Sequence, residues 1–210
     1  MISPALKHKR SAVKNIVRFP AIKANGGKTI LVNSILVSKY CLHLEFDPNV
    51  VTYFPQPKTF KISDEDGEIT YSPDFEVHYV LGMRSLVVVN SLERYKSIHN
   101  QQLFDRFEST LHDPNFNFSV VDELEIYKQP LLSNYEKLYQ YRKRPTLDMR
   151  NLNNCVAGIT KPMPLSRLFA TLGERVSLRE IYSWLALGFL RFNMSAESLN
   201  MTTEVTFDVN

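Results

Sequence analysis

The 210-residue chain has few cysteines and no long apolar segment. Its two cysteines, Cys41 and Cys155, are far apart, which excludes a disulfide framework and a zinc site built on clustered thiolates. No apolar run approaches the roughly 18 residues of a membrane helix, and the N-terminus lacks an apolar signal segment. There are no internal repeats. We therefore expect a protein of the reducing cytoplasm that has no membrane partner.

The remaining composition is that of a globular protein. Hydrophobic residues make up 44% of the chain and charged residues 22%, which excludes a disordered, collagen-like or low-complexity chain. Two hundred and ten residues suffice for one or two small domains, at roughly 100–200 residues each.

The net charge of +3 is distributed unevenly. Residues 1–28 hold seven cations and no carboxylate, namely Lys7, Lys9, Arg10, Lys14, Arg18, Lys23 and Lys28. Such a block is typical of an arm that binds a polyanion, but it is also typical of a solvated tail. Composition alone does not distinguish these two interpretations.

The first 130 residues predict an α/β domain. Hydrophobic periodicity and turn residues predict a helix, five strands, a second helix and a last strand. Their ranges are Ile30–His43, Val50–Phe54, Thr59–Ile62, Glu68–Tyr71, Asp74–Val80, Ser85–Val89, Gln101–Leu111 and Phe116–Val121. The run Leu86–Val89 is apolar on both faces, so we expect it to be a central strand.

The last 80 residues are mostly helical. A helix over Leu131–Arg142 precedes three short helices, Met149–Ala157, Pro164–Leu172 and Ser177–Leu187, the last with a Ser177–Glu180 capping box. Two strands follow, over Phe189–Met194 and Glu204–Val209. Three helices before a hairpin are typical of a winged helix-turn-helix domain, which binds either DNA or protein.

Several motifs of the chain resemble the TnsA family, the restriction-endonuclease-like subunits of heteromeric transposases, and most closely those of CRISPR-associated transposons. The motifs are Lys28-Thr29-Ile30-Leu31-Val32-Asn33-Ser34, Cys41-Leu42-His43-Leu44-Glu45-Phe46-Asp47, Gln56-Pro57, Ser72-Pro73-Asp74-Phe75 and Gln129-Pro130. The resemblance implies a basic arm (1–28), an endonuclease-like α/β domain with a mixed sheet flanked by helices (29–130), a connecting helix (131–147) and a winged-helix domain (148–210).

The resemblance also implies partners. A bacterial, cytoplasmic TnsA-like protein would bind transposon-end DNA, an integrase-type transposase similar to TnsB, and an AAA+ regulator similar to TnsC through its C-terminal domain. The predicted recognition helix is largely apolar or aromatic, with Ile181, Tyr182 and Trp184. A helix that reads bases presents more polar side chains. We therefore expect the C-terminal domain to dock mainly protein.

The nuclease site of the family needs a Glu, an Asp, and a Gln or Glu two residues before a Lys. The carboxylates hold Mg²⁺ through oxygen, and the metal activates water. Onto this chain these positions map to Asn33, Asp74, Val88 and Asn90, so Asp74 is the one metal ligand that is retained. The sequence therefore predicts a non-cleaving pseudo-nuclease, which needs no cofactor.

Two other functions stay open. A relocated site would give an active Mg²⁺-dependent endonuclease that makes the 5′ cut at transposon ends. A chain that uses only its winged helix would be a DNA-binding regulator. Residues that could rescue the metal site also have structural interpretations: Glu76 as a solvated strand residue, Glu93 and Lys96 as loop residues, Glu45 and Asp47 as capping residues, and His43 as a packed helix residue.

Overall fold

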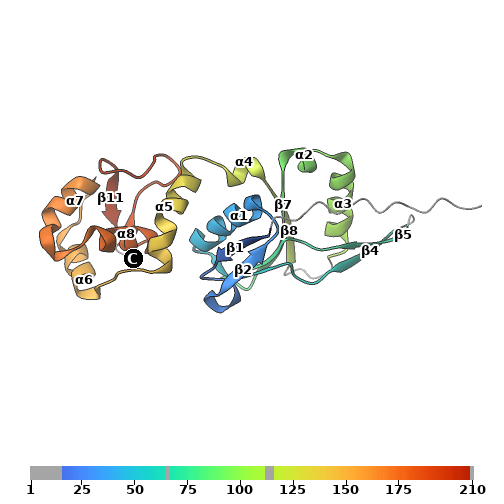
Figure 1. Ribbon diagram of the computed structural model, residues 1–210, viewed down its shortest axis with the longest axis horizontal. Coiled ribbons are helices and arrows are strands. Elements are labelled where there is room, and N and C mark those ends of the chain that lie inside the picture. The colour runs from blue at the N-terminus through green and yellow to red at the C-terminus, as the bar shows by residue number, and fades with distance from the viewer. Residues whose placement is uncertain (1–15, 65–66, 112–115, 209–210) are drawn as a thin grey trace, which may run out of the picture.

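The computed structural model describes residues 16–64, 67–111 and 116–208, and the four cations Lys7, Lys9, Arg10 and Lys14 lie outside them. The chain forms two lobes joined end to end (Figure 1). The N-terminal lobe is a mixed α/β structure built on a four-stranded sheet, and the C-terminal lobe is mostly helical. Within the described ranges, no helix is long and apolar enough to span a membrane.

The four-stranded sheet has the order β3–β6–β7–β8, with β3 (Val50–Pro55), β6 (Phe75–Tyr79), β7 (Arg84–Asn90) and β8 (Phe116–Asp122). The first three strands are antiparallel, and β8 runs parallel to β7. This parallel pair needs a crossover, which α2 (Leu92–Tyr95) and α3 (Ile98–Ser109) provide. The apolar run in β7 is buried throughout, which confirms the prediction of a central strand.

Each face of the sheet packs on a different set of elements. On one face, Val87 and Val89 join a core with Tyr40 and Cys41 of α1 (Ile35–Phe46). On the other face, Leu86 packs with Phe107 of α3 and with the predicted hairpin, now β4 (Phe60–Asp64) and β5 (Gly67–Tyr71). Helix α4 (Glu123–Ile126) follows β8 and contacts α1.

The prediction of a helix starting at Ile30 is wrong. Residues 30–32 belong to β2 (Thr29–Val32), which pairs antiparallel with β1 (Val17–Pro20). Ile30 and Val32 are buried while Leu31 is 54% exposed, which is the two-residue period of a strand. The helix begins only after Ser34, whose hydroxyl accepts from the Val37 amide at 3.1 Å as an N-cap.

The second half of the predicted basic arm belongs to the folded lobe. Phe19 of β1 is buried and stacks on Tyr139 with 5.3 Å between ring centroids. Ala21 and Ala24, which follow β1, are also buried, and a short 3₁₀ turn, η1 (Asn25–Gly27), leads into β2. Residues 17–28 of the predicted arm are therefore part of the folded lobe.

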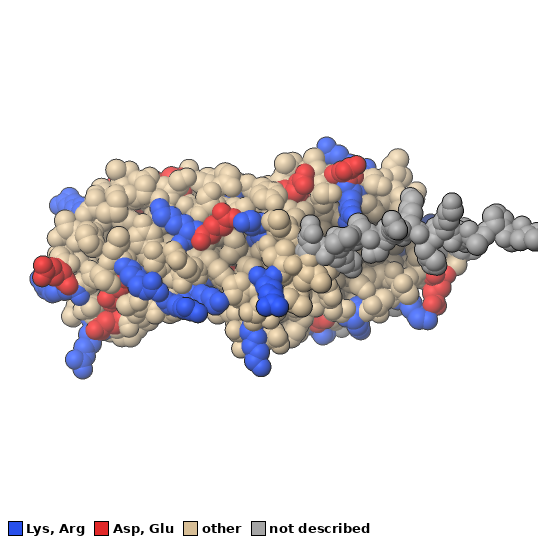
Figure 2. Space-filling model, viewed as in Figure 1, with Lys and Arg blue, Asp and Glu red and all other residues tan. Residues whose placement is uncertain are grey.

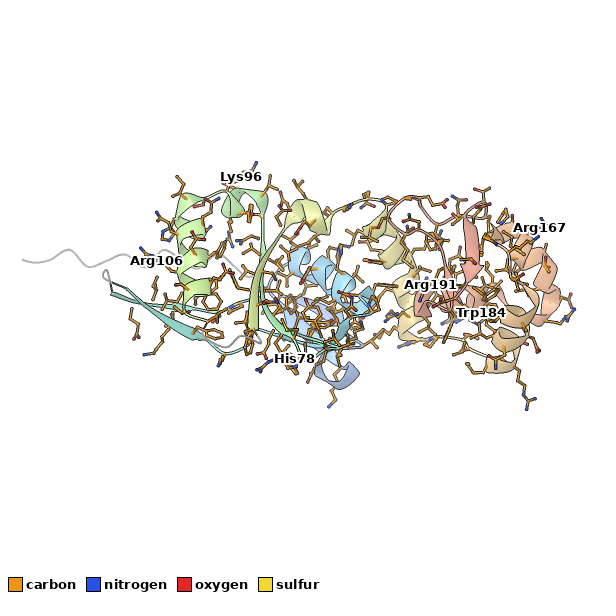
Figure 3. All side chains as sticks on the ribbon, turned by 180° about the vertical axis from the view of Figure 1, so that it is seen from behind. His78, Lys96, Arg106, Arg167, Trp184 and Arg191 are labelled. Carbon is orange, nitrogen blue, oxygen red and sulfur yellow. The ribbon has the colours of Figure 1, made fainter. Side chains whose placement is uncertain are left out.

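The C-terminal lobe contains α5 (Leu131–Lys143), α6 (Met149–Gly158), α7 (Leu165–Leu172), the 3₁₀ turn η2 (Gly173–Arg175) and α8 (Leu178–Leu187). Three short strands form an antiparallel sheet of order β10–β11–β9: β9 (Met163–Pro164), β10 (Leu190–Arg191) and β11 (Glu204–Phe207). The sequence did not predict β9, which is only two residues long. Trp184 lies inside this lobe and is fully buried (Figure 3).

Helix α8 is enclosed by its neighbours. Residues 180–186 are all buried, and α5 packs along this helix. Tyr141 of α5 lies over Tyr182, and the Arg142 guanidinium donates to the Ala186 carbonyl at 2.7 Å. Since Tyr139 and Leu138 of α5 belong to the cores of different lobes, α5 fixes the two lobes to each other.

Candidate functional site

Asp74, the carboxylate of the candidate site, lies directly beside β7. The Asp74 amide donates to the Val87 carbonyl at 2.9 Å, and the Asp74 Oδ2 accepts from the Val89 amide at 2.9 Å. Val88 and Asn90 are two residues apart on β7, so they share one face of the sheet. The fold therefore places Asp74 next to the strand that carries two of the other mapped positions.

The fourth mapped position, Asn33, is linked to Asp74 by hydrogen bonds of Gln56. The Gln56 amide nitrogen Nε2 donates to the Asn33 Oδ1 at 2.8 Å, and the Gln56 backbone N–H donates to the Asp74 carbonyl at 2.8 Å. Gln56 thus bridges Asn33, at the start of α1, and Asp74, at the start of β6. No local sequence pattern points to this role of Gln56, although the Gln56-Pro57 pair is part of the motif that carries the resemblance.

This arrangement provides few ligand atoms for a divalent cation. Val88 is only 5% exposed and has no ligand atom, and Asn90, 8% exposed, has a neutral amide. Asp122 is the partner of Asn90 in the parallel ladder, but its carboxylate caps α4 by accepting from the Leu124 and Glu125 amides. Within the described residues, no group of three or more His, Cys, Asp or Glu side chains could hold a metal ion.

The rescue candidates have other partners. The Glu76 carboxylate contacts His78 at 2.7 Å and Arg84 at 4.0 Å. Glu93 and Lys96 belong to α2 and to its C-cap, not to the predicted loop, and both are exposed. Glu76 therefore already has basic partners, and Glu93 and Lys96 do not lie on a strand.

The other three candidates, Glu45, Asp47 and His43, have partners within the fold: Asp47 is the C-cap of α1, and its Oδ1 accepts from the Asn49 amide at 2.8 Å. Glu45 is fully buried, and its Oε1 accepts from the Tyr53 hydroxyl and from the Ile22 amide, both at 2.8 Å. The His43 Nε2 lies 3.0 Å from the Ile126 carbonyl, and burial lowers the pKa of His43, which keeps this ring neutral. The interpretation of His43 as a packed helix residue is consistent with these contacts.

Of the predicted DNA-contacting cations in the described part of the chain, Arg18 and Lys28 are exposed. Lys23 differs, because its Nζ donates to the carbonyls of Leu44 and Asp47 at the end of α1. Burial, with repulsion from Arg142 second, lowers the pKa of Lys23 to about 8. Lys23 therefore caps a helix, and its assignment to a phosphate contact is not supported.

Gln56 has a backbone conformation that provides a test of its bridging role. Its φ of 49° lies in the left-handed region, which costs a non-glycine residue about 1–2 kcal/mol. Gln56→Gly and Gln56→Ala both remove the bond to Asn33, but only glycine relieves the backbone. We expect Gln56→Ala to unfold at lower urea concentration than Gln56→Gly, with a difference in unfolding free energy of about 1 kcal/mol. Equal midpoints would show that the left-handed conformation does not persist in solution.

The comparisons with known proteins identify no relative: no protein-family model matches the sequence, and no curated protein matches it significantly.

Proposed function

We propose that the chain is a TnsA-like transposition protein that binds transposon-end DNA without cutting it. The observation that carries this proposal is the convergence of Asn33, Asp74, Val88 and Asn90, which are separated by up to 57 residues in the sequence, on one end of the sheet. The retained member is the one carboxylate, and the other three side chains are a poor set for Mg²⁺. This is the pattern expected of a nuclease site that has lost its metal.

The order of elements supports the same proposal. The series α1–β3–β6–β7–α3–β8, with three antiparallel strands and a parallel fourth, is what we expect of a restriction-endonuclease-like domain. The series α6–β9–α7–α8–β10–β11 is what we expect of a winged helix. The enclosure of α8 favours protein docking by this lobe, because a helix covered by α5 has no free face to place in a DNA groove. The proposed partners are a TnsB-like transposase and a TnsC-like AAA+ regulator.

The test is an assay with the purified protein, its proposed TnsB-like transposase partner and an end duplex, in Mg²⁺ and in Mn²⁺. We expect binding of the duplex without divalent-dependent 5′ cleavage, and transposition products that are cointegrates. Asp74→Ala should change neither result, because one carboxylate rarely fixes Mg²⁺ alone. Cleavage that disappears in Asp74→Ala would instead establish the active endonuclease. Binding of the duplex without any association with the transposase would favour the stand-alone regulator.

A further inference from the structure

Strand β8 lies at an edge of the four-stranded sheet, and its outer side is open. In the described ranges, only β7 pairs with β8, and no side chain is hydrogen-bonded to the outward-facing backbone groups of residues 116–121. The pairing with β7 is continuous over all seven residues, without a bulge. The sequence of β8, Phe-Asn-Phe-Ser-Val-Val-Asp, has no Pro, Lys or Arg. Edge strands that stay unpaired commonly carry one of these protective features, so we expect this edge to pair with another strand.

A groove lies beside the N-terminal half of β8, and we refer to it as the β8 groove. It has a volume of about 780 Å³, and its lining comes mainly from the turn between β6 and β7 and from β8 itself. In this turn, Leu81 is 89% exposed and Val80 is 57% exposed, so a large apolar surface faces solvent next to the open edge. Among the described lining residues, the one charged side chain is Glu108 of α3.

Exposed apolar side chains also follow the C-terminal end of β8. Helix α4 begins directly after Asp122; its Leu124 is 66% exposed, and Tyr127 at its C-cap is 43% exposed. Ile126 packs into the same core as α1, so α4 lies on the α1 side of the sheet, whereas α3 lies on the other side (Figure 1). The edge therefore has an apolar groove at its start and two exposed apolar side chains at its end.

We propose that two copies of this chain pair through β8 in antiparallel orientation, which joins their two sheets into one. A two-fold axis perpendicular to the sheet reverses the direction of the strand and keeps each face of the sheet on its own side. It therefore brings Leu124 and Tyr127 of one copy to the β8 groove of the other, on the α1 side. Glu108 belongs to α3, on the opposite side, so it does not face the acidic residues of the other copy's α4.

The sequence of β8 is compatible with pairing to itself. Full overlap of the two seven-residue strands places the axis at Ser119, their middle residue. Phe118 then faces Val120 of the other copy, which is a favourable aromatic–β-branched pair, and Asn117 faces Val121. No two like charges meet across the paired strands.

A second copy accounts for more of this surface than another partner does. An unrelated extended segment would pair with the edge but would leave the exposed side chains of α4 uncovered. Charge does not indicate a different partner either: Figure 2 shows Lys and Arg side chains scattered along the viewed face of both lobes, with Asp and Glu side chains among them. Dimer formation through β8 is independent of the proposed binding of transposon-end DNA.

The test is sedimentation velocity of the full-length protein at increasing concentration, up to the solubility limit. We expect a concentration-dependent dimer. Leu124→Ser should raise its dissociation constant by ~10-fold or more, because both copies lose an apolar anchor. Ser119→Lys should raise it several-fold, because two lysines then meet at the axis. Ile69→Ser, at a 41% exposed position on β5, is the matched apolar control and should have no effect.

Cross-linking tests the register. The native thiols of Cys41 and Cys155 are both buried, so an added cysteine reports on its own position. Ser119→Cys should form a disulfide between copies on oxidation, because residue 119 opposes itself across the axis. Asn117→Cys is the matched control, and it should not cross-link because it faces Val121.

A monomer at every concentration would overturn the proposal. So would a dimer whose dissociation constant is the same in the unchanged protein, in Leu124→Ser and in Ser119→Lys, with circular dichroism showing that both variants are folded. Cross-linking of Asn117→Cys as readily as Ser119→Cys would equally contradict the antiparallel pairing of β8 with itself.

Discussion

The variant Asn33→Glu/Val88→Glu/Asn90→Lys should cut duplex DNA in Mg²⁺, whereas the unchanged protein should not. The three substitutions rebuild, around Asp74, the oxygen ligands and the lysine that the TnsA resemblance implies. The three carboxylates at positions 33, 74 and 88 can hold Mg²⁺ together with substrate phosphate, and the bound metal then activates water. The lysine stabilises the charge that develops on the phosphate.

Single substitutions should not restore cutting, because the groups act as one unit. Val88→Glu alone should also destabilise the fold, since it places a carboxylate at a position that is only 5% exposed, without a partner. In the triple variant, Mg²⁺ would neutralise this charge. Metal at about 100 times its Kd should then stabilise the variant by about 2.7 kcal/mol, or by roughly 5–11 °C in Tm.

Two measurements check this result independently. Nicking of supercoiled plasmid reports cleavage, and the Tm with and without Mg²⁺ or Ca²⁺ reports the metal site even where cutting is slow. Asp74→Ala in the triple variant is the control, and it should abolish both effects. A triple variant that folds but shows neither effect would contradict the mapping of Asn33, Val88 and Asn90 to the lost ligands.

Most strands of the N-terminal lobe could be predicted because their apolar residues alternate with polar ones or form a continuous run. The apolar run of β7 could only be a central strand, and the acidic turn after Ile62 marked the β4–β5 hairpin. The predicted start of α1 at Ile30 was wrong for a specific reason. Ile30 and Leu31 fit a helical period together with later residues. Only their pairing with β1, which is not visible in a local window, makes them a strand.

The candidate site was predictable only where its side chains belong to a motif. Asp74, Val88 and Asn90 followed from the resemblance, and the structure brings their backbones together. The bridging role of Gln56 depends on a left-handed backbone conformation and on one bond to Asn33, and neither leaves a periodic signal. Lys23 was assigned to the arm because it lies among the seven cations of residues 1–28. Its burial depends on contacts with the end of α1, about 20 residues later.

Replacement of Glu45 by Ala should destabilise the protein more than any other single change discussed. Glu45 is fully buried and accepts from three donors: the Tyr53 hydroxyl and the Ile22 amide at 2.8 Å, and the Lys23 amide at 3.2 Å. Alanine would leave the buried Tyr53 hydroxyl and the two half-buried amides without this partner. Removal of one member of such a network costs about 3–5 kcal/mol, which corresponds to a fall in Tm of roughly 6–20 °C.

The loss of Glu45 should also affect the candidate site. Ile22 and Lys23 connect β1 to η1 and β2, and Asn33 follows β2 directly, so loss of Glu45 should loosen the segment that positions Asn33. Amide hydrogen exchange should therefore increase in β1 and β2 of Glu45→Ala before it increases in β7.

Tyr53→Phe removes one donor and should cost only about 1 kcal/mol. Glu136→Ala is the surface control: it breaks the exposed pair with Lys39 and should change the unfolding free energy by less than about 1 kcal/mol. If Glu45→Ala and Glu136→Ala lowered the Tm equally, Glu45 would not hold β1 and β2 in place.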